Sequence, residues 1–256
     1  QLLSCVTICM NSLNREIGQL GTPRQSPRRC VGYANGLSAM LSTSRLQPLY
    51  GAVDVFARVF TQATDLLKTS STSELRVASI QIQVAWILIG GLMPLGPSFV
   101  KTHLSQLMLL WKNALPKHLG KENAAQPGTV ETSFLTHVRE CALGSLLVFM
   151  EFNSKLITSD GAKRIGAMLQ HTVEFLDNLP KPKAMEDLSQ RLHPSLQLQD
   201  YSTMVRRRVL QCFTKLVHVH PPSHGDIISQ SSLLSLAISS FADPDAQYKQ
   251  LESSIS

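Results

Sequence analysis

Apolar residues along this chain recur at intervals of three and four, which is the spacing of one face of an α-helix. No stretch alternates between apolar and polar residues for long enough to indicate a β-sheet. The clearest helical face comprises Val53, Phe56, Val59, Phe60, Ala63, Leu66 and Leu67. The pattern predicts an all-α protein, with helices over 1–20, 31–43, 48–67, 132–152, 160–179, 201–219 and 227–242.

The most apolar stretch predicts a helical hairpin. Residues 77–100 carry no charge, and two apolar segments, 77–93 and 99–111, flank the break Pro94-Leu95-Gly96-Pro97. Proline removes a backbone donor and clashes with the preceding turn, so we expect a buried helix, a tight turn and a second helix packed back on the first. The alternative is a membrane span. Segment 77–93 is shorter than the ~20 residues that a span needs, and it contains a serine and two glutamines.

A shared register indicates a repeated unit. An aliphatic residue followed by arginine opens three apolar runs, at Leu75-Arg76, Val138-Arg139 and Val205-Arg206. The two-helix units so marked exceed the ~40–47 residues of HEAT or armadillo repeats, so inserted loops or an extra helix must lengthen them. We therefore expect one HEAT/armadillo-like α-solenoid of antiparallel helix pairs over residues 1–256. Its expected units are 1–70, 73–115, 131–180 and 201–243, and its expected loops are 22–30, 116–130 and 180–200.

Three details of the helix ends follow from residue type. Asp160 is expected to cap the helix over 160–179 by accepting from the free amides at its start. Pro180-Lys-Pro182 is expected to end that helix, and Pro194 to lie in a loop. Gln47-Pro48 is expected to open the helix that continues to residue 67, because proline suits a first helical turn.

Composition agrees with helix-on-helix packing. Aromatic residues make up only 6% of the chain, and charged residues 16%, against the ~25% usual for a soluble domain. A low charge fraction fits a segment whose neighbours cover part of its surface. The net charge of +6 permits contact with acidic protein surfaces, anionic lipid or nucleic acid.

The ends of the sequence and its cysteines indicate what kind of protein the chain belongs to. The chain begins at Gln1 inside an apolar run and ends without a targeting signal, so we expect a piece of a longer protein. Such a piece would expose apolar surface at both ends and would tend to self-associate. The five cysteines lie mostly in helical patterns and predict reduced, buried thiols of a cytosolic protein; they are Cys5, Cys9, Cys30, Cys141 and Cys212.

No residue pattern points to catalysis or to a bound ion. His218, His220 and His224 could gather a metal, but a diproline intervenes, and histidine at a helix end also complements the helix dipole. Cys5 and Cys9 would form only half of a zinc site. Gly90-Gly91 and Leu95-Gly96-Pro97 lack the Walker pattern, and glycines there favour close helix packing. We expect no enzyme, no cofactor and no metal.

Candidate partner contacts are arginines and tryptophans. Arg206, Arg207 and Arg208 fan over roughly 200° of a helix and so cannot form one flat patch. Arg206 shares the register of the recurrent arginine and is expected to be structural, whereas Arg207 and Arg208 are either solvated or intramolecular side chains or contacts for a partner. Trp86 and Trp111 are expected on facing helices of the hairpin, as core residues or, if exposed in a groove, as peptide anchors.

The N-terminal loop is a separate candidate. Arg24, Arg28 and Arg29 flank Ser26-Pro27, so the loop over 22–30 is either an ordinary basic loop or a phosphorylation site. A phosphate there would add roughly two negative charges beside the arginines.

Three segments resemble one known family. QVAWILIGGLMPLGPSFVKTHLSQLMLLWKN at 83–113, GYANGLSAML from residue 32 and YSTMVRRRVLQCFTKLVHVHPP at 201–222 are similar to segments of the HEAT repeat-containing protein 5 family, in the same order. The resemblance implies a cytosolic, non-catalytic α-solenoid scaffold. It also implies association with aftiphilin, gamma-synergin and the clathrin adaptor, and peripheral attachment to trans-Golgi and endosomal vesicles during endosome-to-Golgi transport.

Two other functions remain as alternatives. A basic α-solenoid could bind nucleic acid or act in nuclear transport, and such binding would fall steeply with salt. No ordered stripe of basic residues with interleaved aromatics supports this alternative. A membrane protein would rest only on residues 77–100.

Overall fold

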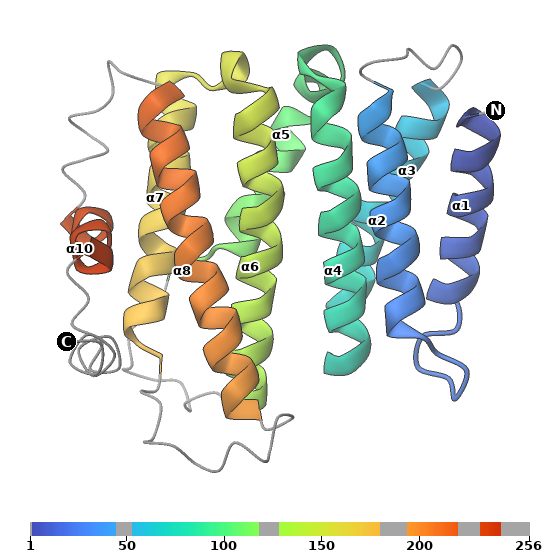
Figure 1. Cartoon of the computed structure of the whole chain (residues 1–256), viewed down its shortest axis with the longest axis horizontal. Helices are drawn as coiled ribbons and strands as arrows, with labels where there is room; N and C mark the ends of the chain where they lie inside the picture. The colour runs from blue at the N-terminus through green and yellow to red at the C-terminus, as the bar shows by residue number, and fades with distance from the viewer. Residues whose placement is uncertain (1, 45–52, 118–127, 180–193, 220–230, 242–256) are drawn as a thin grey trace, which may run out of the picture.

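A computed structural model describes residues 2–44, 53–117, 128–179, 194–219 and 231–241 (Figure 1). Every regular element in these residues is helical, which confirms the all-α prediction. The α-helices are α1 (Leu2–Ile17), α2 (Pro27–Thr43), α3 (Val53–Ser70), α4 (Leu75–Leu92), α5 (Pro97–Ala114), α6 (Thr129–Phe152), α7 (Ser159–Asp177), α8 (Pro194–Val219) and α10 (Ser231–Phe241). Two single-turn 3₁₀ helices, η1 (Met93–Leu95) and η2 (Ser154–Leu156), follow α4 and α6.

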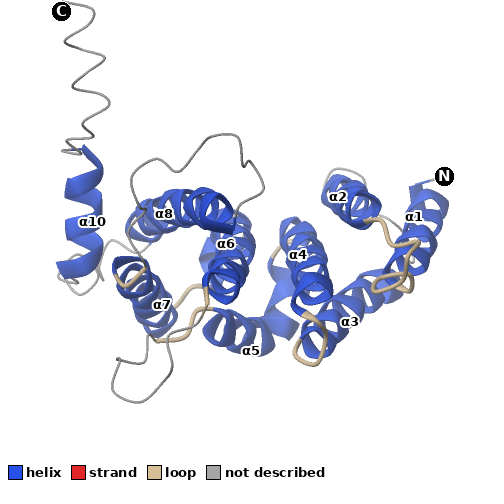
Figure 2. Ribbon diagram, turned by 90° about the horizontal axis from the view of Figure 1, so that it is seen from below, coloured by secondary structure: helices blue, strands red, loops and turns tan. Residues whose placement is uncertain are grey.

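The helices form two layers. Helices α2, α4, α6 and α8 lie side by side in one layer and run in the same direction, while α3, α5 and α7 lie behind them (Figures 1 and 2). Helix α1 packs against α2 at one end, and α10 packs crosswise against α7 and α8 at the other. The buried apolar core runs between the layers.

The central stretch forms the predicted helix, tight turn and second helix, but α5 packs mainly against α6 and not back on α4 as expected. Helix α4 ends at Leu92, η1 contains the first proline, and α5 begins at Pro97. Gly96 joins the two with a φ of 88°, a left-handed conformation that suits a residue without a side chain. The segment Leu75–Leu95 is long and apolar enough to cross a membrane, but 67% of its most apolar window is buried inside the structure. It therefore fits the core helix of a layered α-protein.

Buried polar side chains tie the layers and turns together. Asn153 is fully buried, and its Nδ2 donates to the Met93 carbonyl over 2.9 Å, which fixes the end of α6 to η1. Arg139 is also buried, with its guanidinium 3.7 Å from the ring centroid of Phe175 and a hydrogen bond of 3.5 Å to the Pro116 carbonyl. Burial lowers the pKa of Arg139 to about 10, so the guanidinium stays charged at neutral pH. Arg139 thus has the structural role that the sequence suggested for Arg206.

The starts of three helices differ from prediction. Helix α2 begins at Pro27, not 31, so the predicted loop over 22–30 is too long; the proline occupies its first turn. Thr158, not Asp160, caps α7, its side chain accepting from the Gly161 amide over 3.1 Å. Pro194 opens helix α8, where a loop was predicted.

Other predictions concern residues outside the described ranges. Gln47-Pro48, Pro180-Lys-Pro182 and the first residues of the helix predicted over 227–242 lie there, as do His220 and His224. The proposed division into four repeat units also stays a prediction.

Candidate functional site

The larger of two surface grooves described here lies between α6, η2 and α8, and we call it the α6–α8 groove. Its volume is about 1340 Å³. It is lined by Leu147, Met150, Glu151, Ser154, Lys155, Ile157, Arg207, Leu210, Gln211, Thr214, Lys215, His218 and Val219. The α8 residues among these recur every three or four positions, so one face of that helix forms the wall.

The floor of the α6–α8 groove is apolar. Met150 and Ile157 are buried, while Leu147, Leu210 and Val219 are half-buried and face the groove. These side chains come from α6, α8 and the residue after η2, so the floor exists only where the three segments meet. An apolar floor of this kind would gain free energy by excluding water when a partner covers it.

The rim of the α6–α8 groove is basic. Lys155 and Arg207 are exposed and Lys215 is half-buried, whereas Glu151 is the one carboxylate among the lining residues. The rim therefore carries an excess of positive charge over the apolar floor.

A second groove, the α4–α6 groove, runs from the middle of α4 and α6 to their C-terminal ends and is also lined by α2. Its volume is about 610 Å³. It is lined by Asn35, Ser38, Ser42, Gln83, Trp86, Ile87, Gly90, Pro94, Glu140, Cys141, Gly144, Ser145, Val148, Glu151, Phe152 and Arg208. Trp86 is only 3% exposed, and its indole N–H has no hydrogen-bond partner within the described ranges.

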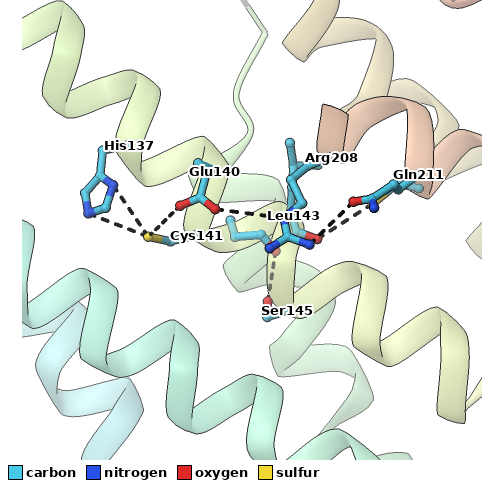
Figure 3. Close-up of polar contacts among 9 residues, drawn as sticks. His137, Glu140, Cys141, Leu143, Ser145, Arg208 and Gln211 are labelled. Carbon is cyan, nitrogen blue, oxygen red and sulfur yellow. Dashed lines mark hydrogen bonds and ion pairs between the residues drawn. The ribbon is translucent and has the colours of Figure 1, made fainter. Parts of the chain in front are cut away.

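A polar cluster borders the α4–α6 groove, at the contact of α6 with α8 (Figure 3). Cys141 Sγ lies 3.8 and 3.7 Å from the two ring nitrogens of His137 and 3.6 Å from Glu140 Oε2. The other Glu140 oxygen lies 3.8 Å from Arg208 Nε, and Arg208 donates to Gln211 Oε1 over 3.4 Å. The Glu140–Arg208 ion pair joins the two helices, whereas the other contacts of the cluster each lie within one helix.

This cluster also contains three metal-ligand types. The donor atoms of His137, Glu140 and Cys141 lie within 4.8 Å of one another. The thiol is almost equidistant from both imidazole nitrogens, so it lies against the ring and not on the axis of one nitrogen. Burial, helped by Glu140, raises the pKa of Cys141 well above its ordinary value, which favours the neutral thiol. The arrangement therefore suits a hydrogen-bonded cluster better than a metal centre.

The four predicted contact residues have different surroundings. Arg207 lines the α6–α8 groove, and Arg208 and Trp86 line the α4–α6 groove. Trp111 is fully buried, and its Nε1 donates to Ser145 Oγ over 2.8 Å, which matches the core alternative and not the peptide-anchor alternative. Arg206 is exposed and lines neither groove, and the structural role expected for it stays a prediction.

The cysteine prediction holds only in part. All five cysteines are free, and Cys30 and Cys212 are buried as expected. Cys5 is exposed on α1, which contradicts the predicted burial.

In the N-terminal loop, Ser26 lies immediately before Pro27 at the start of α2.

Most residues that line the two grooves were not among the predicted contact residues. The spacing His137-x-x-Glu140-Cys141 places three polar groups on one helical face and could have indicated the cluster. No such local signal exists for the α6–α8 groove, since its two walls lie about fifty residues or more apart in the chain. No protein-family model matches the chain, and no solved structure matches it.

Proposed function

We propose that this protein is a non-catalytic scaffold whose helices form a HEAT/armadillo-like α-solenoid and whose grooves bind partner proteins. Four helices running in the same direction in one layer, with others behind them, support stacked antiparallel pairs (Figures 1 and 2). In such a stack each pair contacts mainly its neighbours, which leaves long grooves between them.

The α6–α8 groove carries this proposal. It joins an apolar floor to a charged rim, which is the usual composition of a protein-binding surface. The described residues lining it include no phenylalanine, tyrosine or tryptophan on which nucleic-acid bases could stack. Protein partners are therefore favoured over single-stranded nucleic acid.

The cellular process is proposed from the resemblance to the HEAT repeat-containing protein 5 family. The resembling segments contribute α2, the α4–α5 hairpin and α8, and α8 forms one wall of the α6–α8 groove. The process is clathrin-adaptor-dependent traffic from endosomes to the trans-Golgi. The partners are aftiphilin, gamma-synergin and adaptor components, which would hold a cytoplasmic protein at these vesicles peripherally.

Co-precipitation from cells tests this function. The protein, tagged and expressed at native level, should recover aftiphilin, gamma-synergin and adaptor subunits at about physiological salt, with recovery that survives nuclease treatment. Their absence from repeated experiments would contradict the trafficking function. Recovery of nuclease-sensitive and salt-sensitive nucleic acid instead would favour the alternative class.

A further inference from the structure

We propose that the α6–α8 groove binds an acidic, amphipathic helix of a partner protein. The inference deepens the proposed scaffold function by giving the chemistry of the bound segment. It depends on the partner being a protein, but not on the vesicle-traffic assignment.

The floor calls for an apolar stripe on the partner. Buried Met150 and Ile157 form its deepest part, and half-buried Leu147, Leu210 and Val219 surround them. A helix that presents residues at i, i+3, i+4 and i+7 could cover this floor, because those positions share one face. Long aliphatic side chains on the partner would pack against a floor that is itself aliphatic.

The rim determines the charge of the partner. Arg207 and Lys215 lie eight residues apart on α8, about 12 Å along the helix axis, and Lys155 lies on the η2 side. Glutamates flanking the apolar stripe of a bound helix could pair with these cations. A basic helix would place its cations against them and gain only Glu151, so the groove discriminates by charge.

The length of the groove sets the length of the bound segment. The α8 lining residues run from Arg207 to Val219, which corresponds to about 18 Å, or roughly three helical turns. We therefore expect one short helix of about 12–16 residues, with the leucine-type stripe and acidic flanks described above.

Fluorescence anisotropy with three designed peptides tests the proposal on the whole 256-residue chain. The first peptide is an acidic helix with a leucine stripe and glutamate flanks. The second replaces its glutamates with lysine, and the third replaces its leucines with serine. We expect the first to bind about tenfold or more tightly than the other two, and its affinity to fall between about 50 and 300 mM salt.

A matched pair of double variants locates the binding. R207E/K215E reverses two rim cations, and the control R206E/K112E makes the same charge change at exposed arginine and lysine side chains outside the groove. We expect the groove variant to weaken binding of the acidic peptide at least about fivefold and the control to change it less than about twofold. Circular dichroism checks folding, and R207Q/K215Q replaces the groove variant if it unfolds.

Several results would overturn the proposal. It is wrong if the acidic peptide fails to bind at millimolar concentration, if the lysine peptide binds as well, or if the two double variants lose affinity equally. It is also wrong if R207E/K215E dissociates a dimer that R206E/K112E leaves intact in sedimentation velocity, because a second copy would then occupy the groove. Binding of an oligonucleotide with the same variant dependence would point to nucleic acid. Co-precipitation failure alone would affect only the trafficking assignment.

Discussion

Trp111 shows how one residue fixes two helices. Its indole N–H donates to Ser145 on α6, and its ring lies 5.0 Å from that of Phe149 at 47°. The sequence placed this residue correctly on the second helix of the hairpin and suggested that it faces α4. The structure shows that Trp111 contacts α6 instead. The sequence could not predict this contact, because a packing partner far along the chain leaves no local signal.

Trp111→Phe should lower the free energy of unfolding by about 2–3 kcal/mol. About 1 kcal/mol comes from the lost buried hydrogen bond, and the rest from the void left by the smaller ring. Urea unfolding measures this change. Tyr33→Phe, on a half-buried residue of α2, is the control and should cost less than about 1 kcal/mol. A stability equal to wild type in Trp111→Phe would contradict the packing described for α5 and α6.

His137 gives stability a specific dependence on pH. Burial lowers its pKa to about 4, and the groups around it are Cys141, Glu140 and Tyr201, whose ring centroid lies 4.6 Å away at a tilt of 34°. The unfolded chain takes up a proton near pH 6.5, but the folded chain does so only near pH 4. The buried, neutral imidazole of His137 is therefore compatible with folding above pH 6.5, and the folded state loses stability as pH falls from about 6.5 to 4.

His137→Gln should flatten that dependence. When pH falls from 7 to 5, the free energy of unfolding of the wild type should drop by about 2 kcal/mol more than that of the variant. Each unit by which the folded and unfolded pKa values differ is worth about 1.4 kcal/mol. Urea titrations at both pH values measure the difference. His218→Gln is the control, since that side chain is exposed. Parallel losses in His137→Gln and wild type would show that the imidazole is not buried.

At the scale of elements, two adjacent glycines of α4 differ in how closely a neighbouring helix approaches them. A Cβ on Gly91 would lie 2.4–2.7 Å from side-chain and backbone atoms of Ser38 on α2, whereas a Cβ on Gly90 would meet nothing closer than 3.8 Å. Gly91 thus lets α4 approach α2, as the sequence suggested for this glycine pair.

Substituting each glycine by alanine tests that approach. Gly91→Ala should destabilise the fold by about 2 kcal/mol or more, because α2 must move away. Gly90→Ala should be neutral or stabilising by up to about 1 kcal/mol, because alanine favours a helix. Thermal or urea unfolding of both variants gives the comparison. Equal effects would contradict the close contact between α2 and α4.

Local patterns predicted most elements but not how they meet. The apolar period and the two prolines were sufficient for α4, η1 and α5. Thr158 and Asp160 are both good capping residues two positions apart, so only the geometry shows which one caps α7. Pro194 suits either a loop or a first helical turn, and the fold selects the helix. The α6–α8 groove depends on the relative placement of distant helices, which no local pattern encodes.

At the scale of the whole molecule, the two outer helices carry exposed apolar side chains. Ile8 on α1 is 65% exposed and Ile238 on α10 is 59% exposed. Exposed apolar surface promotes association. The double variant I8E/I238E should therefore shift sedimentation velocity profiles towards monomer. Leu109→Glu is the control, since this residue is 55% exposed on α5 between the ends. A monomeric wild type would contradict the predicted association.

Proximity labelling in cells tests the central claim, that this helical protein is a scaffold and that its α6–α8 groove contacts partners. The protein is fused to a biotin ligase and compared with its R207E/K215E and R206E/K112E variants at matched expression. The account predicts that labelling of aftiphilin, gamma-synergin and adaptor subunits falls in the groove variant and persists in the control. Equal labelling in all three proteins would contradict a partner contact at this groove.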